Sequence, residues 1–92
     1  MLEEVKSSLR IKSNALDEDL KRDIQAALLD MGRVGIDVSG IDPENEITYD
    51  ALILSCVIFH AKWINNFLDR GEEWRKAYTT LRNSMARCGD YN

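Results

Sequence analysis

The segment 51–68 is the feature of this sequence that most constrains the fold. Placed on a helix, it is apolar on nearly every side, so neighbouring elements must cover most of its surface. Its polar residues form one narrow stripe: Ser55, Lys62, Asn66 and Asp69. We therefore expect it to be the central helix of the domain. Thr48 is the expected N-cap, with Ile47 and Leu52 placed for a contact across it. Gly71 is expected to end this helix.

Helical periodicity also marks the segments 2–10 and 14–33. The first is short, so tertiary packing must hold it. The second carries an apolar stripe formed by Leu16, Leu20, Ile24, Ala27, Leu28 and Met31. Ser13 or Asn14 can cap its start, because both side chains accept hydrogen bonds from exposed backbone N–H groups. Two glycines supply natural stop signals at its end: Gly32 and Gly35.

A fourth helix is expected over residues 72–88. Its apolar residues recur at three- and four-residue spacing: Trp74, Ala77, Tyr78, Leu81, Met85 and Cys88. Four polar residues are expected to face away from the core: Thr79, Thr80, Arg82 and Asn83. The predicted fold class is therefore all-α. Residues 1–92 are expected to form one four-helix domain, with a short N-terminal helix, two long core helices and a C-terminal amphipathic helix.

The segment 36–47 is interpreted as a linker between the second and third helices. It contains residues typical of turns: Gly40, Asp42 and Pro43. Its apolar residues alternate, which leaves a short strand at the edge of the core as a second interpretation: Ile36, Val38 and Ile41. At the other end of the chain, the tail 89–92 is expected to fray.

The acidic balance argues against a strongly adhesive nucleic-acid surface. The formal net charge is −4 and the pI is about 4.9, whereas such surfaces usually carry a basic excess. Only two cysteines are present, which favours a reducing compartment. The N-terminus lacks the basic start and apolar core of a signal peptide, and the apolar run 51–61 is too short to span a membrane. A soluble intracellular protein is expected.

The sequence lacks a recognisable catalytic motif, so we expect neither enzymatic activity nor a cofactor. It has no glycine-rich phosphate loop and one histidine. Cys56 and His60 have the spacing of two metal ligands and Cys88 is a third candidate, but no fourth ligand is evident. A buried thiol beside a hydrogen-bonded histidine is therefore preferred to a metal site. The acidic stretch after Asp37 fails as a calcium loop, because Asp42 occupies the required glycine position.

Aromatic residues gather in the second half of the chain, where they form either core or interface anchors. Core packing is the ordinary interpretation. Tryptophan and tyrosine also dominate contact hot spots, and a central helix that is apolar on too many sides favours a partner. The candidate interface residues are Trp63, Phe67, Trp74, Arg75, Tyr78 and Arg82.

A set of short patterns over residues 2–70 carries a resemblance to a known family. The patterns are Leu2-Glu3-Glu4-Val5-Lys6, Leu9-Arg10-Ile11, the acidic Asp17-Glu18-Asp19 before Leu20 and Ile24, the helix end near Gly32 and Gly35, and an apolar helix with His60, Trp63 and Asn66. In this order they resemble the small head–tail connector (head-completion, adaptor) proteins of tailed bacteriophages. Many members finish with a short tail that contains proline and aromatic residues. A full amphipathic helix is expected here instead, over 72–88.

The resemblance implies a structural role at the virion head–tail junction, after synthesis in the host bacterial cytoplasm. Such proteins form a homo-oligomeric ring, usually twelvefold, beneath the portal protein of a DNA-filled capsid. The ring extends the DNA channel and offers a docking surface to tail or stopper proteins, while DNA passes without sequence-specific binding. An acidic lumen would repel the phosphate backbone and let DNA slide. The candidate channel-facing residues are Asp37, Asp42, Glu44 and Glu46.

Two other function classes remain as alternatives. The first is a small helical regulatory or adaptor domain that binds one protein partner as a monomer or dimer. The second is a nucleic-acid-binding module that uses a late basic stripe: Arg75, Lys76, Arg82 and Arg87. Oligomeric state separates the first from a connector, and salt-dependent DNA binding tests the second.

Overall fold

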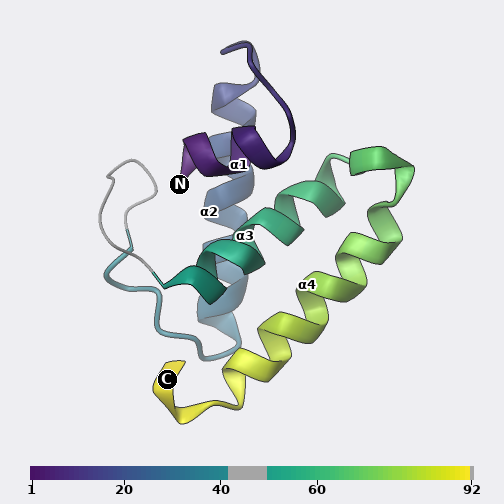
Figure 1. The fold of residues 1–92 in the computed structure, drawn as a ribbon. Coiled ribbons are helices and arrows are strands. Elements are labelled where there is room, and N and C mark those ends of the chain that lie inside the picture. Colours follow the sequence, from purple (N-terminus) through teal and green to yellow (C-terminus); the bar gives the residue numbers. More distant parts are fainter. Residues whose placement is uncertain (42–49, 92) are drawn as a thin grey trace.

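The computed structural model describes residues 1–41 and 50–91 (Figure 1). Within these ranges the chain forms four α-helices and two short 3-10 helices, and no strand. The α-helices are α1 (Leu2–Ser8), α2 (Asp17–Arg33), α3 (Ala51–Ile64) and α4 (Gly71–Ala86), and the 3-10 helices are Phe67–Asp69 and Gly89–Tyr91. The predicted all-α class with four helices is confirmed.

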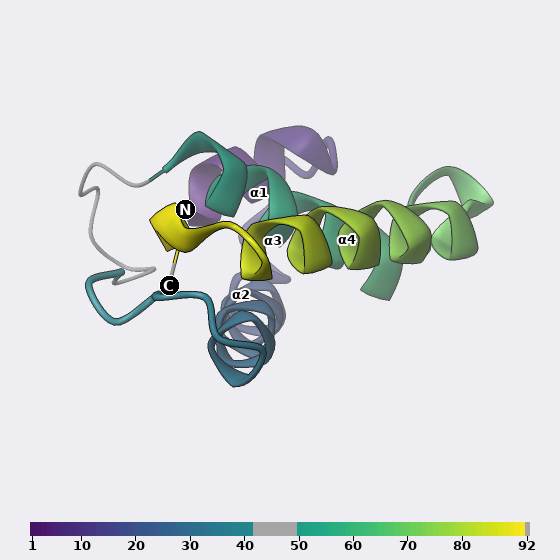
Figure 2. The same cartoon turned by 90° about the horizontal axis from the view of Figure 1, so that it is seen from below.

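Helix α3 is the centre of the arrangement, as its apolar sequence predicts. It packs against α1, α2 and α4. Helix α4 returns beside α3, and α2 crosses behind α3 in the first view (Figure 1). The view from below places α2 on one side of the α3–α4 pair (Figure 2). The molecule is flat, with principal extents of 38 × 29 × 18 Å. In the view of Figure 1, no other helix of the described ranges lies in front of α3.

The core lies where these helices meet, and each helix contributes buried side chains. They include Val5 of α1; Leu20, Ile24, Ala27 and Met31 of α2; Ile53, Val57 and Ala61 of α3; and Tyr78 and Met85 of α4. The predicted stripe of α2 is thus buried, with one exception. Leu16 was expected on that stripe but is 43% exposed, because it precedes the first helical residue.

The start of α2 differs from the sequence-based expectation. The helix begins at Asp17, and the N-cap residue, Leu16, makes no side-chain cap. The predicted cap residues act elsewhere: Ser13 Oγ accepts a hydrogen bond from the N–H of Ala15, and Asn14 Oδ1 accepts one from Lys6 Nζ at 2.8 Å. The buried Lys6 also pairs with Asp17 at 2.9 Å. This lysine therefore ties the turn before α2 to α1.

The end of α2 follows the glycine signal. Gly35 has a φ of +100°, a conformation that glycine adopts without steric cost. The N–H of Gly35 bonds to the carbonyl of Gly32, and the N–H of Ile36 bonds to the carbonyl of Met31. This is the Schellman pattern, in which the residue after the glycine packs on the last turn. Ile36 is accordingly buried.

Helix α3 has a different cap and a different end from those expected. Asp50 is the N-cap, and its Oδ1 accepts a hydrogen bond from the N–H of Leu52 at 2.7 Å. The predicted cap Thr48 and the predicted contact from Ile47 lie outside the described residues. The helix ends at Ile64, four residues before the predicted Leu68, because the backbone turns there into left-handed conformations.

Gly71 begins α4 and does not end α3, which corrects the prediction. Its N–H donates to Asn66 Oδ1 at 2.8 Å. Asn66 itself has a φ of 48°, a left-handed conformation that asparagine tolerates better than most residues. One asparagine therefore turns the chain and also satisfies the first backbone donor of α4.

The segment 36–41 forms no strand, and the rest of the predicted linker, residues 42–47, lies outside the described residues. The described part contacts the C-terminus, since the N–H of Asp37 donates to the carbonyl of Tyr91 at 2.6 Å. The hydroxyl of Tyr91 in turn bonds to the carboxylate of Asp50 at 3.1 Å. We expected the tail to fray, but Tyr91 thus contacts both Asp37 in the described part of the linker and Asp50 at the start of α3.

Candidate functional site

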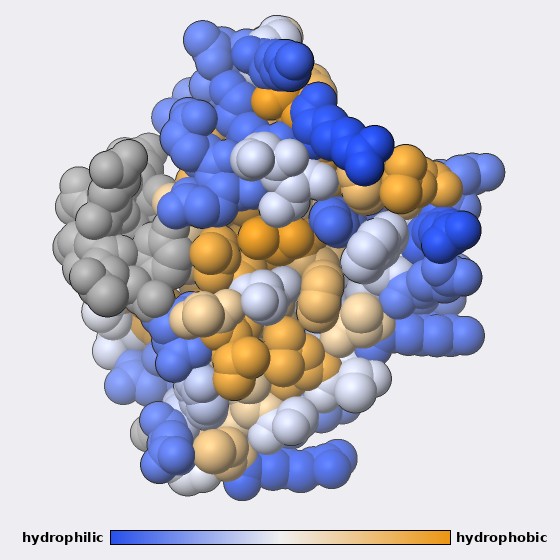
Figure 3. Space-filling view, viewed as in Figure 1, coloured by the Kyte–Doolittle hydropathy of each residue, from blue (hydrophilic) through white to orange (hydrophobic). Residues whose placement is uncertain are grey.

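The outer face of α3 is the first apolar surface that the other helices in the described ranges leave partly open. The inner face is buried and consists of Ile53, Cys56, Val57, His60 and Ala61. On the outer side, Leu52 is 44% exposed and Leu54, Ile58 and Phe59 are partly buried. Figure 3 shows apolar surface gathered over α3 and α4 in the middle of this side of the molecule. Contiguous exposed apolar surface is a candidate contact site.

The turn between α3 and α4 is a second apolar surface, here called the α3–α4 corner (residues 64–70). Ile64 is 50% exposed and Leu68 is 58% exposed. Apolar surface is visible over this corner at the upper right of Figure 3. Both residues were expected inside the third helix and largely covered. They are exposed because that helix ends at Ile64, so the sequence pattern could not identify them.

Aromatic rings and one lysine hold the corner in place. The indole N–H of Trp74 donates to the carbonyl of Phe67 at 3.0 Å, and the Trp74 ring stacks on Phe59 with centroids 6.0 Å apart. Lys62 Nζ lies 4.4 Å from the Trp74 centroid and 5.0 Å from that of Phe67, within the range of a cation–π interaction. The corner is therefore an ordered structure and not a loose connection.

The backbone of the corner is strained at Leu68. Its φ is 56° and its ψ is 26°, a left-handed conformation that costs a residue with a Cβ about 1–2 kcal/mol. Asn66 and Asp69 share this conformation, but their short polar side chains suit it better. The chain thus accepts strain at a leucine whose side chain points largely into solvent, a combination that is typical of a functional contact.

Tyr78 and Arg82, two of the predicted interface residues, act inside the molecule. The Tyr78 hydroxyl donates to Asp30 Oδ2 at 2.6 Å, and Arg82 Nη1 donates to the same oxygen at 2.8 Å. Arg33 donates to Asp30 Oδ1 at 2.8 Å. Arg82 was expected to face away from the core, but it faces α2 because Asp30 supplies a partly buried anion there. These contacts join α2 to α4.

The charge of Asp30 is set by this network. Partial burial alone would raise the pKa of its carboxyl group, but the hydrogen bonds from Tyr78, Arg33 and Arg82 outweigh burial and hold the pKa far below its usual range. Burial and the bond to Asp30 raise the pKa of Tyr78 far above its usual range. The network therefore consists of a fixed carboxylate, a neutral phenol and two guanidinium groups.

Cys56 and His60 lie on the inner face of α3. His60 packs edge-on against Trp63 and Tyr78, with centroids 5.4 and 5.1 Å apart. Its Nδ1 is buried without a hydrogen-bond partner among the described residues, and burial lowers its pKa, so the ring is neutral near pH 7. Burial also raises the pKa of Cys56 to about 12. The part of the chain that the structure describes contains no group of three potential metal ligands.

The remaining predicted interface residues lie at or near the corner. Phe67 belongs to it, Trp74 packs against it from α4, and Trp63 is half-buried beside it. Arg75 pairs with Glu72 at 3.0 Å on the next turn of α4. The structure thus brings three of the four predicted aromatic residues together at the corner. Tyr78 and Arg82 point inward, and Arg75 lies on a neighbouring turn. The basic stripe does not form one surface either, since Arg82 faces α2.

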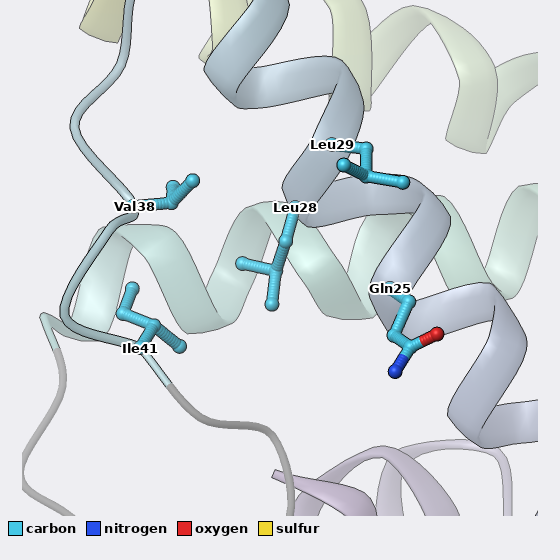
Figure 4. Close-up of a pocket in the computed structure, with 5 residues that line it drawn as sticks. All are labelled: Gln25, Leu28, Leu29, Val38 and Ile41. Atoms are coloured by element: carbon cyan, nitrogen blue, oxygen red, sulfur yellow. The ribbon is translucent and has the colours of Figure 1, made fainter.

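A hollow beside α2 is a third apolar surface, here called the α2 hollow. It has a volume of about 380 Å³ and is open to solvent. Its lining consists of Gln25, Leu28, Leu29, Val38 and Ile41 (Figure 4). In the close-up Val38 and Ile41 lie across from Leu28. Leu29 is 75% exposed, and the sequence pattern did not single it out because it lies outside the helical stripe.

Among the predicted channel-facing acids, only Asp37 lies in the described residues; Asp42, Glu44 and Glu46 lie outside them. Asp37 is exposed, and its Oδ1 accepts hydrogen bonds from the backbone N–H and the hydroxyl of Ser39. These bonds lower the pKa of its carboxyl group, so Asp37 stays charged. None of the helices in the described ranges combines the length and apolar character that a membrane span requires.

A family model described as "Phage connector protein" matches residues 1–84. Neither a curated protein nor a solved structure matches the chain. The matched range includes α1, α2, α3 and most of α4, so it extends beyond the resemblance read from residues 2–70. The amphipathic helix that we expected to depart from the family therefore falls, up to residue 84, within the family pattern.

Proposed function

The chain belongs to the phage connector protein family, and on that premise we propose that it is a subunit of a ring at the head–tail junction of a virion. The family role is structural. In the proposal, identical copies form a ring of twelvefold symmetry beneath the portal protein, where the ring extends the DNA channel. Its free side receives the tail or a stopper protein. The subunit is made in the host bacterial cytoplasm and catalyses nothing.

The observation that carries this proposal is the partly exposed apolar surface on the outer face of α3. A small domain buries a limited share of its surface, yet it usually places its most apolar helix under cover on all sides. Here Leu52 is exposed, and Leu54, Ile58 and Phe59 are only partly buried on the central helix of the fold. A contact with another polypeptide would remove this apolar surface from water and would favour assembly.

The predicted interface residues take different parts in the proposal. Trp63, Phe67 and Trp74 support the α3–α4 corner, and Arg75 lies one turn along α4. Tyr78 and Arg82 hold α4 against α2 and so fix the angle at which the corner is presented. They would affect assembly as positioning residues and not through direct contact, because Tyr78 is buried and Arg82 is engaged by Asp30.

The acidic residues Asp37, Asp42, Glu44 and Glu46 are proposed to face the DNA channel. A lumen of the same sign as the phosphate backbone disfavours adhesion, so DNA slides without being bound. Replacing the four with asparagine and glutamine in the phage should hinder DNA passage. Unchanged DNA ejection from virions that contain this variant would remove the channel assignment and leave the ring proposal intact.

The oligomeric state tests the ring itself. Native mass spectrometry of the full chain, alone and with the portal protein of the same phage, should give one complex of many copies on the portal. A subunit that stays monomeric alone but assembles on the portal also supports the proposal. A strict monomer or dimer, bound to a single partner in the presence of portal, would support the regulatory or adaptor domain.

A further inference from the structure

We propose that neighbouring copies in the ring contact each other head to tail, with the α3–α4 corner of one copy seated in the α2 hollow of the next. This inference rests on the proposed function, because it names the two surfaces that the ring would join. We call Ile64 and Leu68 of the corner the knob. The aliphatic residues of the hollow that would receive it are Leu28, Leu29, Val38 and Ile41.

The two surfaces match in apolar character. Ile64 and Leu68 project from the corner with about half of each side chain in water. The hollow is lined by four aliphatic residues and one glutamine. Its volume of about 380 Å³ lies in the range of pockets that enclose a small ligand, roughly 300–1,000 Å³, so it has room for aliphatic side chains. A single contact between neighbouring copies would bury both the knob and the hollow.

The positions of the two surfaces suit a contact that repeats. The corner lies at one end of the molecule, and the segment 36–41, which forms one wall of the hollow, lies at the opposite end (Figures 1 and 2). A contact between two different surfaces leaves one of each free on every dimer, so further copies can add until a ring closes. A contact between two identical surfaces would stop at a dimer.

Charge supports the same pairing. Arg70 at the corner is exposed, and its nearest carboxylate partner, Glu73, is 3.8 Å away. Lys62 and Arg10 lie over the Phe67 ring on the same corner. At the other end, Asp37 is exposed next to the hollow. Opposite potentials speed encounter and fix orientation, so attraction between Arg70 of one copy and Asp37 of the next would favour this pairing.

This assignment leaves the channel proposal in place for Asp42, Glu44 and Glu46. Asp37 borders the proposed contact, and the edge of a subunit contact in a ring also borders the lumen. A channel variant that replaces the other three acids and keeps Asp37 therefore separates the channel from the contact.

Two single variants, Leu29→Glu and Leu68→Asp, test the pairing in a mixing experiment. Each should fold, because both leucines are more than half exposed, and circular dichroism with thermal melting checks this. Each variant alone retains only one working surface, so under conditions in which the wild type assembles it should show no contact between its own copies in native mass spectrometry. An equimolar mixture should give a one-to-one heterodimer and nothing larger, because one intact corner meets one intact hollow.

Cross-linking supplies a second measurement that does not depend on disrupting the contact. In a Cys88→Ser background, Leu29→Cys and Leu68→Cys introduce single accessible thiols, since Cys56 is buried. A short bismaleimide should join the two variants when they are mixed under conditions in which the wild type assembles, and should join neither variant to itself.

The possible results distinguish a failure of the proposed corner–hollow contact from a failure of the proposed ring. If the wild type assembles but the leucine variants assemble equally well, the inference is wrong and the ring proposal stands. A dimer formed by one variant alone indicates a contact between identical surfaces and also overturns the pairing. A wild type that never exceeds a dimer, alone or with portal, overturns the proposed function itself.

Discussion

The hydroxyl of Tyr78 donates a hydrogen bond of 2.6 Å to the carboxylate of Asp30, across a sequence separation of 48 residues. This bond joins α4 directly to α2, whose contact with the rest of the core otherwise runs mainly through α1 and α3. Arg82 binds the same carboxylate oxygen at 2.8 Å. The junction therefore adds a direct link between α2 and α4 to the packing of α4 on α3.

Removal of the Tyr78 hydroxyl should destabilise the fold without unfolding it. A hydrogen bond to a charged group contributes about 1.5–3 kcal/mol, so we expect Tyr78→Phe to lower the free energy of unfolding by about that amount in urea titrations. The matched control is Tyr91→Phe, whose hydroxyl bonds to Asp50 at an exposed site and should cost less than about 1 kcal/mol. Equal losses in the two variants would contradict the importance of the junction.

His60 should make stability fall between neutral and mildly acidic pH. Burial lowers its pKa in the folded state, while the unfolded chain binds the proton near pH 6.5. Between these values the unfolded state holds more protons, so the free energy of unfolding falls as pH is lowered. The slope cannot exceed about 1.4 kcal/mol per pH unit for one group. Urea titrations at pH 7.5 and 5.5 should show the loss.

The control for this pH effect is His60→Phe, which keeps a ring against Trp63 and Tyr78 but cannot bind a proton. Its stability should be nearly flat over the same pH interval. A wild-type slope that persists in this variant would assign the effect to another group.

A second loss of stability should begin at lower pH and originate at Asp30. The pKa of this carboxyl group is far below its usual range in the folded state, so the unfolded state takes up the proton first as the solution is acidified. The stabilisation is fully present above about pH 4 and is lost as pH falls further. Asp30→Asn should be less stable near neutral pH and should lose less on acidification to pH 2, as measured by thermal melting.

Two glycines in helices should respond oppositely to alanine. A Cβ at Gly71 would lie 2.7 Å from Asn66 Oδ1, the acceptor for the N–H of Gly71, so Gly71→Ala should break this bond and cost about 1–2 kcal/mol. A Cβ at Gly32 would make an ordinary 3.5 Å contact with Val38. Gly32→Ala should therefore gain about 0.5–1 kcal/mol from helix propensity. Similar melting temperatures for the two variants would contradict the tight turn at Asn66.

Periodicity alone predicted the helices and the buried stripe of α2, because Leu20, Ile24 and Met31 repeat with the period of one helix face. It did not predict the helix ends. Asp50 and Asn66 determine these ends through single hydrogen bonds, which leave no repeated pattern in the sequence. The Asp30–Tyr78 junction was missed for a related reason, since nothing local in either helix indicates that the two side chains meet.

The candidate site was predicted only in part, because the sequence shows which side chains are large but not where the helices end. Tryptophan and phenylalanine are large wherever they lie, so Trp63, Phe67 and Trp74 could be named from composition and spacing. Their arrangement depends on where α3 stops. Once the chain turns at Asn66, Leu68 leaves the helix and becomes exposed, and no apolar pattern distinguishes such a leucine from a core one.

Leu68 offers a last test, because its contributions to folding and to assembly should have opposite signs. Asparagine tolerates the left-handed backbone better than leucine, so Leu68→Asn should raise the free energy of unfolding of the monomer by about 0.5–1 kcal/mol. The same change removes the apolar side chain from the proposed knob and should weaken assembly on the portal. Ile64→Asn is the control: Ile64 is similarly exposed but helical, so it should weaken assembly with no gain in stability. A stabilised Leu68→Asn protein that still assembles like the wild type would show that the strain at this corner has another cause.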